Sequence, residues 1–302
     1  MVKKLRIIGA SLGSFEDLDL ERGIEFYKKL SNDFNLAAVE IRFEKEENNR
    51  PALWHWEAGK IKNFLINYEI KGIHLPFVHL DPLSPNPRIR TESLNQLKEA
   101  IEKASEIEAD YAVMHARSIT NLSRSEALEE WKNVIEMLKD HAKAHQVLLT
   151  IENADFFHDL SDLVKIVREI NSKWLRIILD IGHAHIRMVP PLSTFPVKEL
   201  ILRAADAFLP FLLPTKRNMP YEAYGSLKDF IRSEKDLIYG LHIHDYDGKK
   251  DHISLGEGKI NFSFFSELKN FNGPYILEIE FKNHYHDFAR NYKKLVELIK
   301  CQ

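Results

Sequence analysis

Short apolar runs alternate along the chain with longer segments in which apolar residues recur every three or four positions. The short runs are typical of buried strands, and the longer spacing is typical of helices with one buried face. The predicted strands are residues 5–10, 37–42, 72–76, 111–115, 147–152, 175–180, a run leading into 241–245, and 275–280. The predicted helices are residues 20–30, 57–68, 91–108 with Thr91 as N-cap, 123–145, 160–170, 261–271 and 285–300.

Eight strands separated by helices are typical of a (β/α)8 TIM barrel, an α/β fold. A doubly wound open sheet needs a glycine-rich phosphate-binding turn after its first strand, and Gly9 and Gly13 do not form one. No linker divides the chain, so we predict a single domain over residues 1–302. The interval at residues 186–236 is long for a βα unit and holds six of the twelve prolines. We predict an insertion there that shapes or covers a site, with extra packing as the alternative.

The composition is that of an ordinary globular protein, with 44% hydrophobic and 29% charged residues. A net charge of −3 gives no general basic field for nucleic acid, although a local patch remains compatible with it. The single cysteine, Cys301, excludes disulfides within the chain and cysteine-based zinc sites. We find no signal peptide and no apolar run that could span a membrane, so we expect a cytoplasmic protein. The oligomeric state stays open, a homo-oligomer included.

Ionisable side chains stand at the ends of the predicted strands. They are Glu40, His74, His115, Glu152, Asp180, His242, His244 and Glu278 or Glu280, with His183 and His185 just past the sixth strand. In a barrel the C-terminal ends of all strands meet on one face. Ionisable groups at the edge of a buried core are costly unless they are paired or bind metal. We therefore predict a divalent metal site, with a metal-free network of ion pairs as the alternative. Three glycines, Gly248, Gly256 and Gly258, would let the following loop fold back over a ligand.

Several motifs occur in order from the third strand to the eighth. They are His74-Leu75-Pro76-Phe77, Met114-His115, Ile151-Glu152-Asn153, Asp180-Ile181-Gly182-His183, His242-Ile243-His244-Asp245, Gly256-Glu257-Gly258 and Leu277-Glu278. As a set they resemble the xylose isomerase-like TIM barrels. That superfamily holds sugar isomerases and epimerases together with the endonuclease IV type of abasic-site nuclease, also called AP endonuclease family 2.

The resemblance implies a role for one residue at each of the last four strands. In the epimerase-like members one metal is bound by residues that match Glu152, Asp180, His242 and Glu278. The two glutamates would also be catalytic, moving protons on opposite faces of an enediolate. We expect Glu40, His185, His244 and Glu280 to contact the substrate.

The nuclease branch of the superfamily binds two further metals. Its ligands match His74, His115, His183 and His252, which could alternatively serve the substrate. The branch also has an aspartate two residues before the last of these histidines. Lys250 occupies that position here, and Asp251 lies directly beside His252. The sequence therefore leaves undecided whether the chain has a third metal site.

These residues leave three classes of function. The first is a metal-dependent isomerase or epimerase that acts on a small carbohydrate, a sugar or a sugar phosphate, which we place first. The second is an endonuclease IV-like phosphodiesterase with nucleic acid as partner, and the third is a non-catalytic metal-binding barrel. Mn²⁺, Co²⁺, Mg²⁺ and Zn²⁺ all suit some version of the ligand set. The arginines Arg42, Arg88, Arg90, Arg117 and Arg187 could bind phosphate or be ordinary surface, and Trp54-His55-Trp56 could stack on a substrate or begin a helix.

Strand geometry does not separate Glu278 from Glu280. Residues two apart on a strand face the same side, and Glu280 would lie roughly 7 Å nearer the mouth of the barrel. Proximity to the mouth favours Glu280, whereas the family pattern places the ligand in Leu277-Glu278. We follow the pattern and expect Glu278 to bind the metal.

Overall fold

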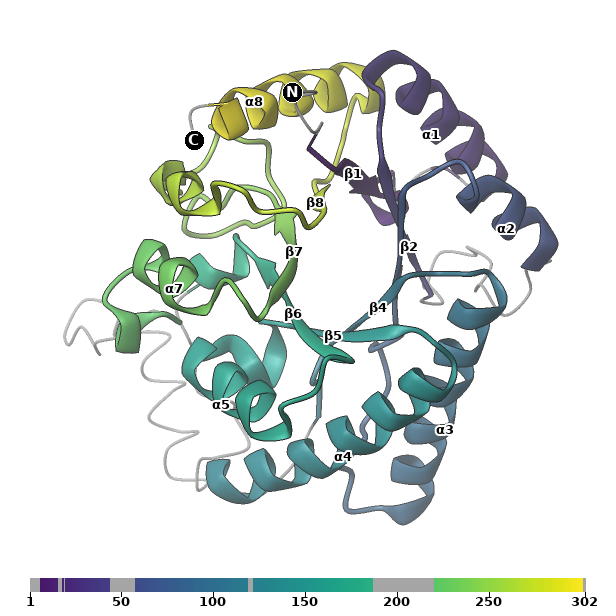
Figure 1. Ribbon diagram of the computed structural model, residues 1–302, viewed down its shortest axis with the longest axis vertical. Helices are drawn as coiled ribbons and strands as arrows, with labels where there is room; N and C mark the ends of the chain where they lie inside the picture. Colours follow the sequence, from purple (N-terminus) through teal and green to yellow (C-terminus); the bar gives the residue numbers. More distant parts are fainter. Residues whose placement is uncertain are drawn as a thin grey trace.

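The structure is a computed structural model that describes residues 6–15, 18, 20–43, 58–118, 122–186 and 220–300. Eight parallel strands close into a barrel, and each strand pairs with the next one along the chain (Figure 1). They are β1 (Ile8–Ser11), β2 (Ala38–Arg42), β3 (Ile70–His74), β4 (Tyr111–Met114), β5 (Leu148–Glu152), β6 (Leu175–Asp180), β7 (Ile238–Ile243) and β8 (Tyr275–Leu277). The predicted (β/α)8 TIM barrel is confirmed.

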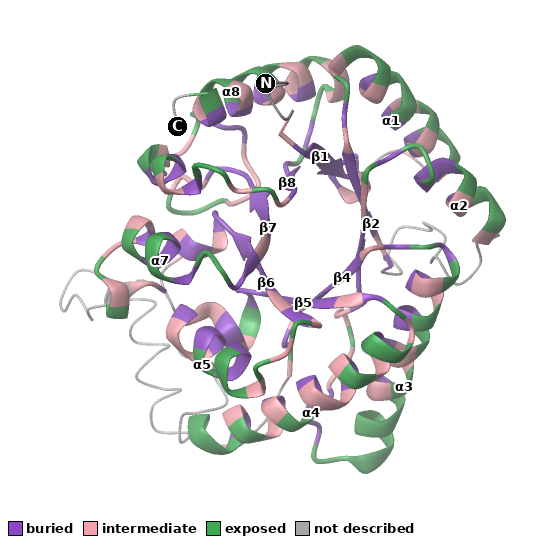
Figure 2. Ribbon diagram, viewed as in Figure 1, coloured by how far each residue is buried: buried purple, intermediate pink, exposed green. Residues whose placement is uncertain are grey.

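Helices surround the barrel on its outside (Figure 1). They are α1 (Leu20–Phe34), α2 (Ala58–Leu65), α3 (Pro87–Glu106), α4 (Arg124–Ala144), α5 (Leu160–Ile170), α7 (Leu227–Glu234) and α8 (His284–Lys300). Shorter 3-10 helices include η1 (Leu12–Ser14), η3 (Asp155–His158), η4 (His183–His185), η6 (Glu222–Tyr224) and η7 (Phe262–Leu268). Each long helix buries one face against the strands and leaves the other exposed (Figure 2), as its apolar spacing predicts.

Helix boundaries follow local capping chemistry. The helix predicted from Ser123 is confirmed, because the Ser123 and Glu126 side chains each bond the other's backbone N–H. The N-cap predicted at Thr91 is wrong. The third helix begins at Pro87, and the Asn86 side chain accepts a hydrogen bond from the Arg88 N–H. Proline suits the first helical position because its φ is already helical and it has no N–H to leave unpaired.

Three predicted segments differ in detail from the structure. The strand predicted over residues 275–280 ends at Leu277, so Glu278 and Glu280 lie beyond it rather than on it. The helix predicted over residues 261–271 is the 3-10 helix η7. The interval at residues 186–236 contains α7, whose apolar residues Leu227, Phe230 and Ile231 pack into the core. A helix therefore does connect β6 to β7. Residues 187–219 lie outside the described residues, so the role of the interval and the single-domain assignment stay predictions.

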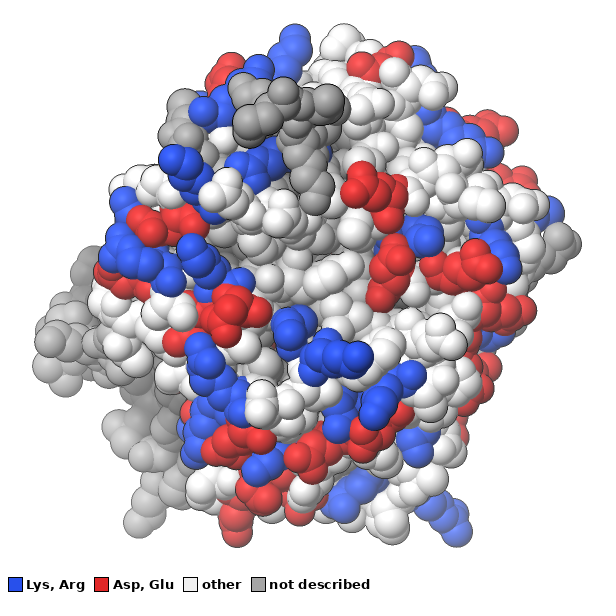
Figure 3. All heavy atoms as spheres, viewed as in Figure 1, with Lys and Arg blue, Asp and Glu red and all other residues white. Residues whose placement is uncertain are grey.

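Burial is concentrated in the strands and in the inward faces of the helices (Figure 2). Lysines and arginines intermingle with aspartates and glutamates over the face shown in Figure 3. Of the helices in the described residues, none has the length and apolar character needed to cross a membrane.

Candidate metal centre

Three carboxylates converge on one imidazole nitrogen at the C-terminal end of the barrel. The Nδ1 atom of His242 lies 2.8 Å from Glu278 Oε2, 3.2 Å from Glu152 Oε2 and 4.0 Å from Asp180 Oδ2. Glu152 and Asp180 end β5 and β6, His242 lies near the end of β7, and Glu278 directly follows β8. The four residues predicted to share a metal therefore lie together.

The second ring nitrogen of His242 is bonded to a carboxylate from across the barrel. Its Nε2 donates a hydrogen bond of 3.2 Å to Glu40 Oε2, which also accepts a bond of 2.9 Å from the Tyr111 hydroxyl. This places the lone pair of the neutral ring on Nδ1, toward Glu152 and Glu278. Metal-binding histidines are commonly fixed in this way, with the second nitrogen bonded to a carboxylate. Among the described residues, His242 Nδ1 has no hydrogen-bond partner of good geometry although it is buried.

A bound cation would stabilise the buried carboxylates around His242. Burial lowers the pKa of His242, but the surrounding carboxylates, Glu40 foremost, outweigh burial and raise that pKa well above its usual value. The side chains of Glu40 and Asp180 are completely buried, so water does not screen them. Buried carboxylates need either bound protons or a metal ion nearby. The donor set of carboxylate oxygens and one imidazole nitrogen fits a divalent ion.

Asp180 is clamped from several directions. Asn153 bonds its backbone on both sides, at 2.6 Å to the N–H and 2.9 Å to the carbonyl oxygen. The His183 N–H donates to Oδ1 at 2.6 Å, and His244 Nε2 lies 2.9 and 3.0 Å from the two carboxylate oxygens. The His252 N–H in turn donates to His244 Nδ1 at 2.9 Å, which leaves Nε2 of His244 as the donor to Asp180. His244 thus orients Asp180.

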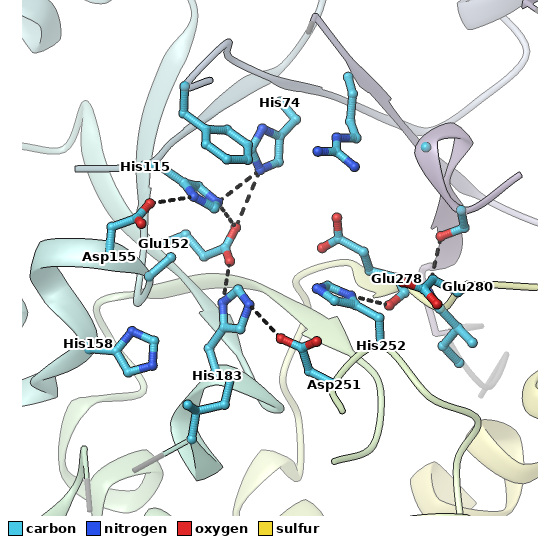
Figure 4. Close-up of a pocket in the computed structure, with 17 residues that line it drawn as sticks. His74, His115, Glu152, Asp155, His158, His183, Asp251, His252, Glu278 and Glu280 are labelled. Atoms are coloured by element: carbon cyan, nitrogen blue, oxygen red, sulfur yellow. Dashed lines mark hydrogen bonds and ion pairs between the residues drawn. The ribbon is translucent and has the colours of Figure 1, made fainter. Parts of the chain in front are cut away.

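A second group of ligands shares Glu152 with the first. His115 Nε2 lies 3.0 Å and His74 Nε2 3.6 Å from Glu152 Oε2 (Figure 4). The outer nitrogens of the two rings donate elsewhere, at 3.0 Å from His74 Nδ1 to the Leu75 carbonyl and 3.1 Å from His115 Nδ1 to Asp155. Both inner nitrogens therefore face the glutamate, in an arrangement that could bind an ion. Burial lowers the pKa of His115, but Glu152 and Asp155 outweigh it and raise this pKa to about 10.

The remaining histidines lie on the far side of Glu152. His183 Nδ1 is 2.9 Å from Glu152 Oε1, so both oxygens of this carboxylate contact histidines. Burial lowers the pKa of His183, but Asp180 and Glu152 raise it to about 9. Ligand atoms of His183, His244 and His252 lie within 4.8 Å of one another. Asp251, which lies one residue after the position of the aspartate in the nuclease branch, also approaches this group of histidines. Its Oδ2 lies 3.8 Å from His183 Nε2.

A cavity of about 390 Å³ opens above these residues (Figure 4). Of the four residues predicted to bind the first metal, Glu152 and Glu278 line it. His74, His115, His183 and His252 line it as well. Asp180 and His242 lie beneath its floor, with no exposed surface.

The family comparison agrees with this geometry. The family described as "Xylose isomerase-like TIM barrel" matches residues 29–300. The chain belongs to this family. An uncharacterized protein of Methanocaldococcus jannaschii is 26% identical over 230 residues, a match that spans 72% of this chain and 66% of that protein.

Solved structures share the fold of this xylose isomerase-like barrel. A D-tagatose 3-epimerase-like protein superposes with a TM-score of 0.69 at 23% identity, covering 97% of both chains. A Thermus thermophilus protein soaked with zinc chloride gives 0.67 at 20% identity, covering 98% of this chain and 99% of that one. An AP endonuclease family 2 protein from Brucella melitensis gives 0.64 at 15% identity, covering 98% and 99%.

The residues expected to contact substrate divide into two sets. Glu280 lines the cavity of this xylose isomerase-like barrel, and its Oε2 lies 2.5 Å from Lys250 Nζ. Glu40 and His244 are completely buried and are not among the residues that line the cavity. His185 also lies away from it, with Nδ1 donating to the Ile181 carbonyl at 2.8 Å.

The sequence analysis assigned no role to several residues that line the cavity, among them Phe77, Asp155 and His158. Phe77 stacks on His115 at 4.2 Å between ring centroids, Asp155 bonds the same ring, and His158 lies 6.0 Å from the His183 ring. Asp155 and His158 follow Glu152 by three and six residues in η3. The sequence signal was an acid and a histidine just beyond a strand end.

The glycine-rich loop folds onto a protein carboxylate. The side chain of Asp245 accepts hydrogen bonds of 2.8 to 3.2 Å from the N–H groups of Tyr246, Gly256, Gly258 and Ile260. A Cβ on Gly258 would lie 2.1 Å from Asp245 Oδ1, so the close approach requires glycine. Asp245 therefore shapes the loop beside the site.

Other candidates from the sequence lie elsewhere. Arg42 lines the cavity, whereas Arg88, Arg90 and Arg117 are exposed and are not among its lining residues. Arg187 and the segment Trp54-His55-Trp56 lie outside the described residues.

Proposed function

We propose that this chain is a divalent-metal-dependent isomerase or epimerase that acts on a sugar or a sugar phosphate. The supporting observation is the placement of two carboxylates. Glu152 from β5 and Glu278 after β8 both contact His242 Nδ1, and both line the cavity. Each can therefore serve the metal and a substrate in the same cavity, as an acid–base pair requires.

Glu152, Asp180, His242 and Glu278 would hold the metal. When bound, the ion polarises a carbonyl oxygen of the substrate and so makes the neighbouring C–H more acidic. Zinc is a reasonable first choice because the similar Thermus thermophilus structure was soaked with zinc chloride. A similar IolI structure, with a TM-score of 0.68 at 13% identity over 97% of this chain and 98% of that one, has a zinc atom bound.

Residues of the chain transfer the protons and position the metal ligands. One of Glu152 and Glu278 takes the proton from the carbon next to the carbonyl, and the other returns a proton. Glu40 and His244 lie below the cavity and support the ligands. Glu40 fixes the tautomer of His242, and His244 fixes the orientation of Asp180. We therefore assign Glu40 and His244 to positioning the ligands. The cavity volume suits a small molecule.

The proposal is tested with the zinc- or manganese-loaded protein and a panel of ketoses and ketose phosphates in D₂O. A converted sugar should gain solvent deuterium at the carbon next to the carbonyl. Glu278→Gln should abolish both conversion and deuterium uptake. Glu169→Gln, which alters an exposed glutamate on the outer helix α5 paired with Lys132, is the matched control and should retain both. Absence of conversion and of deuterium uptake over the whole panel would overturn the proposal.

One observation favours a second function, hydrolysis of a phosphodiester. The group formed by His74, His115 and Glu152 adjoins the group formed by Glu152, His242 and Glu278, and the two share Glu152. Adjacent metals bridged by a carboxylate suit phosphodiester hydrolysis, because they stabilise both the attacking and the leaving oxygen. The similar Brucella melitensis structure is named AP endonuclease family 2.

Metal content and substrate choice separate the two functions. For the hydrolase we expect two or more ions per chain, loss of one in His115→Gln, and cleavage of a duplex that carries an abasic site. For the isomerase we expect ketose conversion to survive in His115→Gln. An intact duplex after incubation with fully loaded protein would remove the second candidate.

A further inference from the structure

Two histidines and a glutamate meet on the outer surface of the barrel, where α3 packs against α4. His141 lies in the last turn of α4, and His145 is the C-cap of that helix. Glu102 lies near the end of α3. We propose that these three residues form a separate zinc site, which joins the two helices.

The geometry suits one ion between the helices. Residues four apart on a helix lie on one face, and the rings of His141 and His145 are 4.6 Å apart between centroids. Glu102 Oε1 approaches from α3 to 3.1 Å from His141 Nε2. Ligand atoms of all three residues lie within 4.8 Å of one another. Two imidazole nitrogens, one carboxylate oxygen and a water complete the tetrahedral coordination that zinc prefers.

A second observation indicates a ligand at this place. The Nε2 atom of His141 is shielded from solvent, yet it makes no hydrogen bond of good geometry with any described residue. Buried ring nitrogens are normally satisfied. A metal ion between His141 and Glu102 would satisfy both, whereas their present contact leaves Nε2 without a hydrogen bond.

The backbone around the cluster is fixed. The Ser105 hydroxyl of α3 donates a 2.8 Å hydrogen bond to the His145 carbonyl oxygen. Ser105 lies three residues after Glu102 on the same helix. This bond ties the end of α4 to α3 beside the proposed ligands. The ion would therefore bind side chains whose backbones are already in place, which lowers the entropy cost of binding.

The site lies at the opposite end of the barrel from the cavity. Both helices end just before their next strands begin, at Tyr111 and Leu148. Their last turns are therefore at the end where strands start, where residues of TIM barrels serve stability rather than catalysis. An ion there would hold α3 against α4 and raise the stability of the protein without contacting a substrate.

The experiment measures bound zinc per chain by equilibrium dialysis and elemental analysis, and the melting temperature with zinc and with a chelator. His145→Gln and Glu102→Gln should each bind one zinc fewer, or bind it at least about 10-fold more weakly. Both should lose part of the zinc-dependent rise in melting temperature, while the chelated proteins melt like the chelated wild type. The matched control, His286→Gln, alters an exposed histidine on α8 and should behave as wild type.

Two results would overturn the proposal. One is an unchanged zinc count and affinity in both His145→Gln and Glu102→Gln. The other is a loss of zinc in Glu102→Gln alone, because a site that does not use His145 lacks the proposed ligand set. Zinc bound at the mouth of the barrel does not obscure the comparison, since all variants retain the metal-binding residues there.

Discussion

Gly182 offers a sharp test of how the mouth of the barrel is built. A Cβ at this position would lie 1.8 Å from Cε1 and 2.3 Å from Nδ1 of His244. His244 is completely buried and bonds both oxygens of Asp180. The substitution Gly182→Ala must therefore displace the ring that orients Asp180.

The size of the effect follows from the overlap. To restore an ordinary contact of 3.4 Å, the ring must retreat by roughly 1.6 Å, which breaks its bonds to Asp180. Overpacking of a buried site costs about 1–3 kcal/mol. With about 2.1 cal/mol/K of unfolding entropy per residue, this lowers the melting temperature of a 302-residue chain by roughly 2–5 °C. Loss of a group that orients a metal ligand weakens metal binding by about 10–100-fold.

Calorimetry measures both quantities. Gly59→Ala is the control, because a Cβ on Gly59 in α2 meets nothing within 4 Å, and it should leave metal binding unchanged. In a His244→Ala background, Gly182→Ala should cost little more, since the clashing ring is gone. Wild-type stability and metal affinity in Gly182→Ala would refute the reasoning.

Three further predictions concern the same mouth. Tyr111→Phe removes a buried hydrogen bond to Glu40 and should cost about 1–3 kcal/mol of unfolding free energy, measured by denaturant titration, with the metal count unchanged. Glu278→Gln should lose bound metal while Glu280→Gln keeps it, as elemental analysis of the two variants would show, and the reverse result would contradict our assignment. Burial lowers the pKa of His115, but neighbouring carboxylates raise it to about 10, so an ion bound by His74, His115 and Glu152 must displace its proton at neutral pH. The affinity of this second group for metal should therefore increase from about pH 6.5 toward pH 10, with proton release measured by calorimetry in buffers of different ionisation enthalpy, and His115→Gln should weaken this pH dependence.

The order of strands and helices could be predicted from the sequence because it is a local property. Each apolar run or helical stripe reports on the burial of its own segment, and parallel strands joined by helices favour a closed barrel. Local capping was predicted less well. The Asn86-Pro87 pair marks the start of α3, whereas the stripe of apolar residues alone pointed to Thr91.

The approximate place of the site could also be predicted, since the C-terminal ends of barrel strands meet on one face. The depth of each side chain could not be predicted from the sequence. Glu40 and Glu152 both lie near the ends of strands, yet Glu40 lies beneath His242 and Glu152 lines the cavity. That difference depends on which side chains oppose one another across the barrel, and residues far apart in sequence decide it.

The sequence by itself determined the barrel, the family resemblance and the set of ionisable residues at the mouth. The tertiary structure decided which nitrogen of His242 faces Glu152 and Glu278, because Glu40 from β2 bonds the other nitrogen and is itself held by the Tyr111 hydroxyl from β4. It also separated Glu278 from Glu280, because β8 ends at Leu277 and the shared strand parity expected of the two residues does not hold beyond it. Glu278 contacts His242, whereas Glu280 pairs with Lys250 from the preceding loop. Periodicity encodes which face a residue occupies, but contacts between distant segments arise only when the barrel closes.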